Sequence, residues 1–320
     1  MKMVVTPLCA LLVAFGLGLV VDAQTPNTVA AEIAAAEAAA GETWQVLQSE
    51  VCGPAQGAVT RFPLVTQTRP AEKMFDNLYV LSNNDVLAWV ITTSEGLVLI
   101  DTMYDRTVQE VIIGSMQKAG LDPAQIKFIY LTHKNSDHAG GAKFLQETYG
   151  ARVLLSAVDW DGIVQPGRGG GAPSPVPPKK DMVIADGQKL TLGDETITFY
   201  ITPASTRGSV SALIPVKDKG VPHLAAFWAS NVISPTSSKE DLNAIAAAAA
   251  RFGDIAAAAG ADVLITNHER YFDLNKKLYS AHANPAGRNP FIVGPTKVKN
   301  YMQVLTHCTQ ALALAAGSKK

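Results

Sequence analysis

The run at residues 133–138 constrains the fold of this chain more than any other feature. It reads His-Lys-Asn-Ser-Asp-His and directly follows an apolar stretch at residues 126–131, which has the length of a buried strand. Residues 139–149 begin Ala-Gly-Gly and predict a helix that ends at Gly150. A loop between a strand and a helix is held rigidly, and the helix turns its free N–H groups toward the same space. The pattern therefore predicts a polar site on a strand–loop–helix unit.

The residue types in this run are those that bind metal ions. The pattern His-x-His-x-Asp-His places four nitrogen and oxygen ligands within six residues, enough to serve two zinc ions, but Asn135 stands at the second histidine position. His268 follows an apolar run at residues 263–265 in a similar way. A single histidine after a strand is more often a surface or hydrogen-bonded residue. The joint occurrence of His133, Asp137, His138 and His268 favours metal binding.

The apolar runs along the chain predict an α/β fold. Short runs at residues 78–81, 88–91 and 97–100 are separated by turn residues, and a helix is expected at 106–119. The order β-β-β-α-β-α-β through residue 155 is typical of an α/β architecture. We expect further strands at 188–192, 196–201, 209–216, 224–228 and 263–265, with helices at 30–40, 241–259 and 296–315. Asp101, just past the third run, either faces a site or caps a turn. The Gly- and Pro-rich residues 165–180 are either a loop over a cleft or a plain surface insertion.

Composition narrows the class of partner. The chain has 320 residues, of which 48% are hydrophobic, so it can bury a large core. Its net charge of -1 gives no electrostatic reason to bind nucleic acid or an anionic membrane surface. Charge therefore gives no case for these two classes of partner, and the sequence leaves the oligomeric state open.

The N-terminus reads as a signal peptide. Lys2 precedes an apolar stretch at residues 4–21, and cleavage is expected near Ala23, which would release a periplasmic or secreted protein without a membrane segment. An uncleaved membrane anchor is the alternative. Cleavage would leave two cysteines, Cys52 and Cys308, near the two ends of the mature protein. In an oxidising compartment such a pair favours a disulfide, and two unrelated thiols are the other interpretation.

Several motifs together resemble the metallo-β-lactamase superfamily. They are Leu-Ile-Asp-Thr at 99–102, Thr-His-x-x-x-Asp-His-Ala-Gly-Gly at 132–141, Thr-Pro-Ala-Ser-Thr-Arg-Gly-Ser at 202–209 and Asn-His at 267–268. The resemblance runs from about residue 75 to 285. It implies an αββα sandwich. We therefore divide the chain into the signal peptide at 1–23, an N-terminal extension at 24–74 and the family domain at 75–320. Because no cysteine stands at a ligand position, the chain is most similar to the secreted subclass whose second zinc is held by Asp, His and His.

The resemblance implies two sets of metal ligands, of which one is complete and one is incomplete. The second-metal set is complete, with Asp137, His138 and His268. The first-metal set keeps only His133, because Asn135 and Ser205 replace two histidines, and an amide or hydroxyl oxygen is a poor zinc donor beside imidazole. We therefore expect one zinc ion and an empty first site. Natural drift and deliberate replacement of ligands would look the same in the sequence.

The resemblance implies a hydrolase that works with one zinc ion on a small-molecule substrate. Its zinc-bound hydroxide would attack an amide, lactam or ester carbonyl, with Asp137 as a catalytic ligand and Asp101 orienting the site, and its activity would be weak. A degenerate family member that only binds small molecules is the main alternative. A third hypothesis is a metal-independent enzyme that uses Lys134 and Arg207 to hold a substrate carboxylate or a developing oxyanion. Both side chains could equally point to water, and the sequence does not name the substrate.

Overall fold

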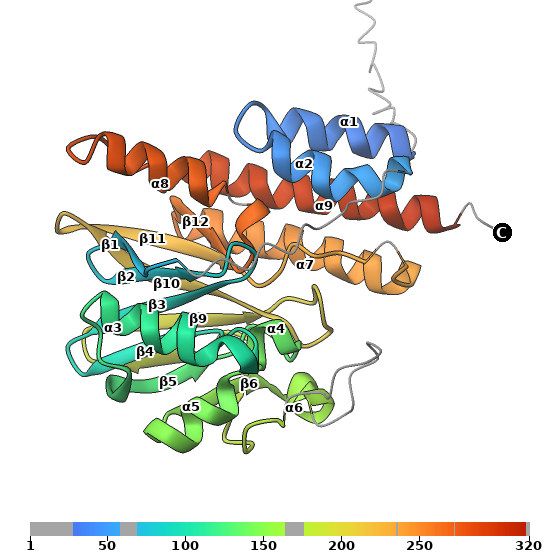
Figure 1. The fold of residues 1–320 in the computed structure, drawn as a ribbon. Helices are drawn as coiled ribbons and strands as arrows, with labels where there is room; N and C mark the ends of the chain where they lie inside the picture. The colour runs from blue at the N-terminus through green and yellow to red at the C-terminus, as the bar shows by residue number, and fades with distance from the viewer. Residues whose placement is uncertain (1–27, 58–68, 164–175, 235, 272, 318–320) are drawn as a thin grey trace, which may run out of the picture.

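Two β-sheets face each other across an apolar core, and helices cover both outer faces (Figure 1). The structure, a computed structural model, describes residues 28–57, 69–163, 176–234, 236–271 and 273–317. This layering is the αββα sandwich that the motifs imply, so the predicted fold class is confirmed.

The first sheet has seven strands in chain order. They are β1 (Glu72–Phe75), β2 (Leu78–Ser82), β3 (Leu87–Thr93), β4 (Gly96–Ile100), β5 (Ile126–Tyr130), β6 (Arg152–Ser156) and β7 (Met182–Ile184). The first four strands are antiparallel, whereas β4, β5, β6 and β7 pair in parallel. Parallel strands need crossover connections, and these place the loops after β4, β5 and β6 at one edge of the sheet.

The second sheet has five strands in the order β12-β11-β10-β9-β8. They are β8 (Lys189–Leu192), β9 (Glu195–Ile201), β10 (Val210–Asp218), β11 (Val221–Trp228) and β12 (Val263–Thr266). Only the β11–β12 pair is parallel. A long helix, α7 (Lys239–Ala258), connects these two strands. Ser238 caps it by accepting a hydrogen bond from the amide of Asp241.

Apolar residues from both sheets fill the space between them. Trp89 on β3, Tyr130 on β5, and Phe199 and Phe227 on β9 and β11 are fully buried there. The first sheet's outer face packs against the segments after β4 and β5: η2 (Asp105–Thr107), the π-helical η3 (Val108–Gly114), α3 (Ser115–Lys118), η4 (Pro123–Gln125), α4 (Ser136–Ala139) and α5 (Ala142–Tyr149).

The helices at the two ends of the chain pack together on the second sheet's side. The helix α9 (Pro295–Gly317) lies beside α7, and α1 (Val29–Ala40), α2 (Gln45–Cys52) and η1 (Gly53–Gln56) lie beyond it (Figure 1). A disulfide joins Cys52 to Cys308, as predicted, and both cysteines are fully buried. The predicted domain boundary at residue 74 falls inside β1, and the N-terminal helices share one apolar cluster with α9.

Some local predictions differ from the structure. The helix expected at 106–119 is divided among η2, η3 and α3, and the helix expected at 139–149 is broken between α4 and α5. The break occurs at Gly140 and Gly141, which approach the β4–η2 loop so closely that a Cβ on Gly140 would lie 2.8 Å from the carbonyl oxygen of Met103. The sequence reasoning also did not predict α2, β1, β7, α6 (Ala157–Ile163), η5 (Glu269–Tyr271) or α8 (Leu274–Ala283).

Two sequence predictions fall wholly or mostly outside the described residues. They are the signal peptide at 1–23 and the loop at 165–180, of which only residues 176–180 are described. Among the helices that the structure does describe, none is both long and apolar enough to cross a membrane.

Candidate metal centre

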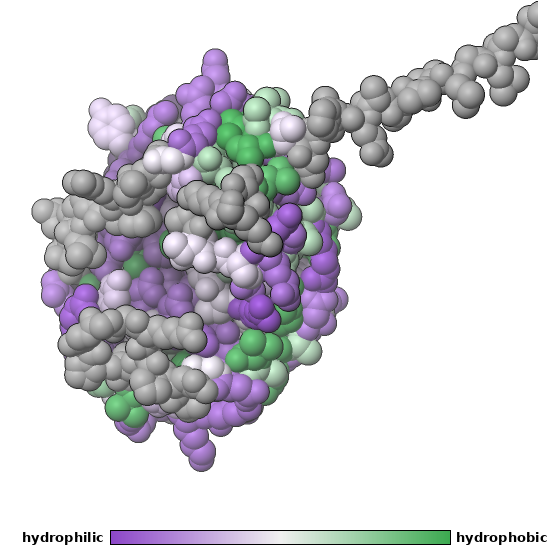
Figure 2. Space-filling model, turned by 90° about the vertical axis from the view of Figure 1, so that its right-hand side faces the viewer, coloured by the Kyte–Doolittle hydropathy of each residue, from purple (hydrophilic) through white to green (hydrophobic). Residues whose placement is uncertain are grey.

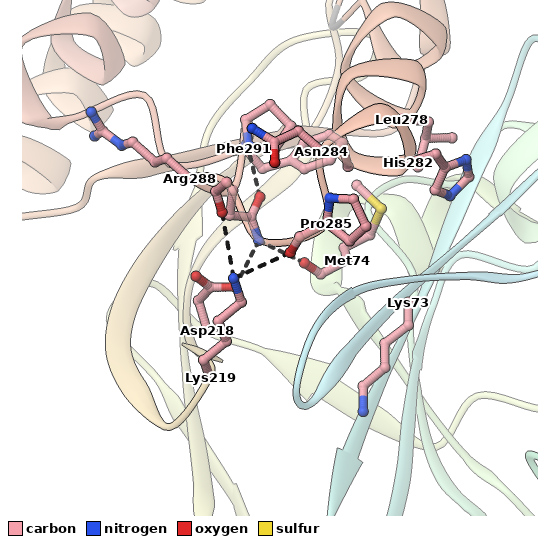
Figure 3. A pocket seen from close by; sticks show the side chains of 14 residues that line it. Lys73, Met74, Asp218, Lys219, Leu278, His282, Asn284, Pro285, Arg288 and Phe291 are labelled. Carbon is pink, nitrogen blue, oxygen red and sulfur yellow. Dashed lines mark hydrogen bonds between the residues drawn. The ribbon is translucent and has the colours of Figure 1, made fainter.

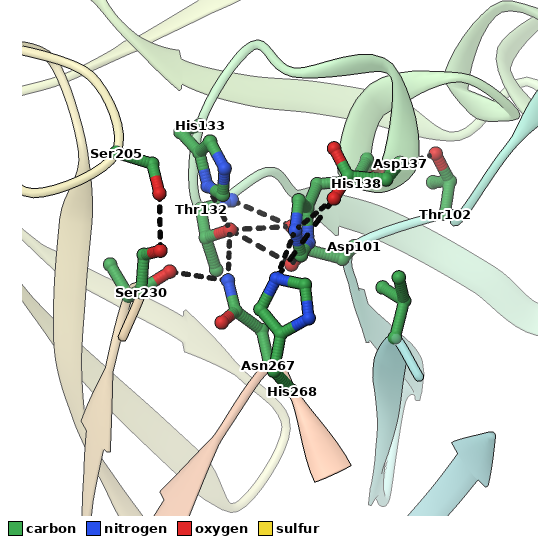
Figure 4. Close-up of polar contacts among 12 residues, drawn as sticks. Asp101, Thr102, Thr132, His133, Asp137, His138, Ser205, Ser230, Asn267 and His268 are labelled. Carbon is green, nitrogen blue, oxygen red and sulfur yellow. Dashed lines mark hydrogen bonds and ion pairs between the residues drawn. The ribbon is translucent and has the colours of Figure 1, made fainter. Parts of the chain in front are cut away.

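The predicted ligands converge at the edge where the two sheets bring their loops together. His133 and the α4 residues Asp137 and His138 follow β5, whereas His268 follows β12 of the other sheet. An isolated bridge between Val86 and His268 fixes the His268 backbone against the first sheet. The side chains lie on opposite sides of one small centre (Figure 4).

Three ligand atoms lie close enough to share one ion. The Nε2 atom of His138 is 3.1 Å from Oδ2 of Asp137 and 3.3 Å from Nε2 of His268. Oδ2 of Asp137 is 3.9 Å from Nε2 of His268. Two imidazoles and a carboxylate that leave space for a further ligand are the donor set of a catalytic zinc site, so these residues fit the metal.

Asp101 orients His138 from behind. Its Oδ2 lies 2.8 Å from Nδ1 of His138, and its Oδ1 accepts a hydrogen bond of 2.8 Å from the amide of Thr132. Asp101 is fully buried, with a backbone φ of 60°, a left-handed conformation that costs free energy outside glycine. A carboxylate on Nδ1 directs the lone pair of Nε2 toward the centre, so Asp101 has the geometry of an orienting residue.

His268 has a carboxylate partner of its own, which the sequence reasoning missed. Oδ1 of Asp85 lies 3.7 Å from Nδ1 of His268. The nearby His268 imidazole lowers the pKa of Asp85 and outweighs the opposing effect of burial. Asp85 lies in the β2–β3 turn, and no spacing in the sequence links it to His268. Both histidines of the centre thus present Nε2 inward and Nδ1 to a carboxylate.

Charge within the centre favours a bound cation. Burial tends to lower the pKa of His138, but the neighbouring Asp137 and Asp101 carboxylates prevail and raise it to about 10. For Asp137, burial is again the largest effect and opposes ionisation, yet His138 and the other histidines hold its pKa well below the usual range. Asp137 therefore stays ionised, and His138 carries a proton that a metal ion would displace.

His133 lies close to this centre, although the resemblance placed it in the incomplete first-metal set. His133, Asp137 and His138 offer ligand atoms that all lie within 4.8 Å of one another, and the ring centres of His133 and His138 are 4.2 Å apart. Its Nδ1 is 2.9 Å from the Thr132 hydroxyl. Burial, reinforced by His138, lowers the pKa of His133 well below its ordinary value, so its ring is neutral. His133 is thus available as a further nitrogen donor.

Asn135 and Ser205 do not complete a second set of metal ligands. Asn135 is exposed at the start of α4, and its side chain makes no capping hydrogen bond there. The Ser205 hydroxyl is hydrogen-bonded to the Ser230 hydroxyl and lies 3.2 Å from the Val232 carbonyl oxygen (Figure 4). Ser205 is therefore paired with neighbouring oxygen atoms of the second sheet's loops.

The two cations proposed from the sequence are directed elsewhere. Nε of Arg207 donates to Asp241 on α7 at 2.8 Å, and the side chain is 68% exposed. The Lys134 side chain runs along α6, where a Cβ added to Gly162 would lie 2.2 Å from Nζ. These placements favour the interpretation that neither cation holds a substrate.

Asp137 is the most exposed of the three proposed ligands, with 24% of its side chain accessible, whereas His138 and His268 are buried. Figure 2 shows the face on which α4 and α6 lie, with hydrophilic side chains gathered in a hollow near its middle.

A separate cleft of about 110 Å³ lies between α8 and the β10–β11 turn, away from the metal centre (Figure 3). There Lys219 donates to the carbonyl oxygen of Pro285, and Asn289 donates to that of Met74. Polar groups of this cleft thus bond to one another and fasten the loop after α8.

Comparison with known proteins agrees with the fold and the ligand motifs. Residues 82–218 match the model of the metallo-beta-lactamase superfamily. BJP-1, a subclass B3 metallo-beta-lactamase of Bradyrhizobium japonicum, superposes with a TM-score of 0.65 and 26% identity, over 76% of this chain and 92% of that one. Native FEZ-1 from Legionella gormanii superposes with a TM-score of 0.66 and 24% identity, over 75% and 94% of the two chains.

A curated relative is similar over a shorter segment. The hydroxyacylglutathione hydrolase of Acidiphilium cryptum is 26% identical over 129 residues, which are 40% of this chain. The chain spans less than half the length of that relative. The sandwich fold and the cluster of histidine and aspartate ligands define a metal-binding αββα protein. Residues 82–218 carry the motifs of a metallo-beta-lactamase superfamily domain, and the fold around them is similar to that of subclass B3 metallo-beta-lactamases.

Proposed function

We propose that this protein is a hydrolase that works with a single zinc ion held by Asp137, His138 and His268. The observation that carries the proposal is the convergence of Oδ2 of Asp137 with the Nε2 atoms of both histidines, all within 3.9 Å. Hydrolase names among the similar proteins support the reaction class. The substrate would be a small molecule with a hydrolysable carbonyl, such as an amide, lactam or ester.

Each residue has a distinct task in this proposal. A zinc ion bound here would act as a Lewis acid toward water and toward a substrate carbonyl. Asp137 contributes the negative charge, and its low pKa keeps that charge at neutral pH. Asp101 and Asp85 hold the rings of His138 and His268 with Nε2 pointing inward. With one ion instead of two, less charge is available to polarise the substrate, so we infer weak turnover.

The disulfide supports export of the protein. Buried disulfides persist in oxidising compartments and are rare in reducing ones, and Cys52 and Cys308 are both fully buried. We therefore infer a periplasmic or secreted location, consistent with the apolar N-terminus. N-terminal sequencing of the exported protein should find Gln24 as the first residue, and an intact Met1 would contradict cleavage.

A zinc-dependent assay tests the proposed activity. The purified protein should hydrolyse a chromogenic cephalosporin or a hydroxyacylglutathione, lose turnover in a chelator and regain it with zinc. Asp137→Asn should lose the zinc-dependent activity, whereas Asp161→Asn, an exposed change on α6, should not. Bound zinc without turnover on any carbonyl substrate would favour a small-molecule-binding protein, the second candidate, which Asn135 and Ser205 favour.

A further inference from the structure

A carboxylate outside the metal centre joins the loop after β5 to the loop before β10. Asp159 lies on α6, directly after β6, and is only 1% exposed. Its Oδ2 accepts a hydrogen bond of 3.0 Å from the amide of Lys134 and one of 2.7 Å from the Thr206 hydroxyl. Lys134 adjoins His133, and Thr206 adjoins Ser205. One oxygen atom therefore connects the two loops that carry the incomplete ligand set.

The other side of the Asp159 carboxylate is closely packed. A Cβ on Gly208 would lie 2.6 Å from Oδ1 of Asp159 and 2.4 Å from the Ser156 hydroxyl oxygen, so any larger residue there would displace one of these two side chains. The Ser156 hydroxyl donates to the Gly208 carbonyl oxygen at 2.6 Å, and it accepts a hydrogen bond from the Asp159 amide. The loop at 203–209 is thus held at two points. Asp159 binds the Thr206 side chain, and Ser156 binds the Gly208 backbone.

Burial distinguishes the hydrogen bonds of Asp159 from an exposed ion pair on the protein surface. Oδ1 of Asp159 is buried without a hydrogen-bond partner among the described residues, so the two donors to Oδ2 are what offsets the desolvation of the carboxylate. That compensation lasts only while both loops stay in place. Asp161, two residues further along α6, shows the contrast. Its side chain is 78% exposed, and its partner is the exposed Lys180 at 3.3 Å. An exposed ion pair of this kind contributes little to the free energy of folding.

We propose that Asp159 is a positioning residue that fixes the His133 loop to the Ser205 loop and thereby sets the geometry of Asp137 and His138. The His133 loop continues directly into α4, which carries both of those ligands. A shift of the Lys134 backbone would therefore move α4 relative to His268 on the other sheet. This inference rests on the proposed zinc site only for its effect on metal affinity, because the link between the loops requires no metal.

Hydrogen–deuterium exchange of the metal-free full chain tests the link itself. Asp159→Ala should raise the exchange rates of residues 132–138 and 203–209 together, at least several-fold, with little change in α5 or α7. Asp159→Asn, which keeps an acceptor oxygen, should show a smaller increase, and Asp161→Ala should show none. Faster exchange confined to α6, or none in either loop, would overturn the proposal whether or not the protein binds zinc.

Zinc affinity tests the positioning role. Asp159→Ala should weaken zinc binding by about tenfold or more, as removal of residues that orient metal ligands commonly does. Asp159→Asn should restore most of the affinity, whereas loss of a purely structural contact would lower the melting temperature alone. Unchanged zinc affinity in a folded Asp159→Ala variant would overturn the positioning role. If the wild-type chain binds no zinc, the proposed function fails, while the exchange measurement still decides the link.

Discussion

Asp101 shows how much a single buried side chain contributes to the centre. It orients His138, receives hydrogen bonds from Thr132 and holds a left-handed backbone conformation. Asp101→Asn keeps the size of the side chain but removes its charge. We expect this change to lower zinc affinity by about 10- to 100-fold, the usual effect of removing a residue that orients a metal ligand. Competition with a zinc-sensitive dye measures this, and an affinity equal to that of wild type would contradict the assigned role.

Arg207 tests whether a cation serves the vacated ligand position. Its guanidinium pairs with Asp241 and is largely exposed, so we expect Arg207→Ala to leave KM and kcat within about twofold of wild type. Steady-state kinetics on the substrate found for the wild-type protein measures the effect. A tenfold or larger rise in KM would support the alternative in which Arg207 holds a substrate carboxylate.

Lys277 on α8 gives stability a pH dependence of its own. Burial lowers the pKa of its ammonium group to about 7, and the group lies 5.2 Å from the centre of the Trp44 ring. The unfolded chain retains the ordinary pKa of 10.5, so between pH 7 and pH 10.5 it binds more protons than the folded chain. The free energy of unfolding therefore rises with pH through this range.

The matching substitution is Lys277→Met, with the exposed neighbour Lys276→Met as control. We expect Lys277→Met to raise the free energy of unfolding by a few kcal/mol at pH 7, because each unit of pKa shift corresponds to ~1.4 kcal/mol. The gain should shrink toward pH 10, whereas the control should stay within ~0.5 kcal/mol at both values. Urea denaturation at the two pH values measures it, and a gain independent of pH would be inconsistent with the lowered pKa.

At the scale of elements, the disulfide fastens the two ends of the chain. It joins α2 to α9 across 256 residues of sequence. Closing so long a loop lowers the entropy of the unfolded chain and stabilises the folded state by about 5.5 kcal/mol in the loop-entropy model. We expect Cys52→Ala with Cys308→Ala to melt several degrees lower than the oxidised wild type, a difference that calorimetry can detect. The double variant should also be insensitive to reductant, and an equal melting temperature would contradict this contribution.

Elements with strong periodic or positional signals could be predicted from the sequence, and those formed by tertiary packing could not. The strands that carry the centre follow from continuous apolar runs such as residues 126–131, and the helix expected at 241–259 corresponds to α7. The short helix α6 has no such signal, and Asp159 was missed with it. Asp85 was missed because the fold alone brings the β2–β3 turn to His268. Motif spacing selected side chains that the structure brings together, whereas Asp101 and Asp85, which contact the two histidines, lie far from them in sequence.

At the scale of the whole molecule, two sheets each contribute one part of the metal centre. Asp137 and His138 come from the first sheet, and His268 comes from the second. Hydrophobic packing between the sheets therefore determines the distances among the ligands, and the paired changes at Asn135 and Ser205 leave this packing intact. In the proposed function, the fold therefore holds one metal centre, and Asn135 and Ser205 leave the second ligand set incomplete.

The zinc content of the purified protein tests this account most directly. Elemental analysis after dialysis against a low concentration of zinc should give one zinc ion per chain. His268→Ala should lose that ion, and His223→Ala, which removes a histidine paired with Asp262 far from the centre, should keep it. Two tightly bound zinc ions in the wild-type protein, or full retention of zinc by His268→Ala, would contradict the single centre of Asp137, His138 and His268.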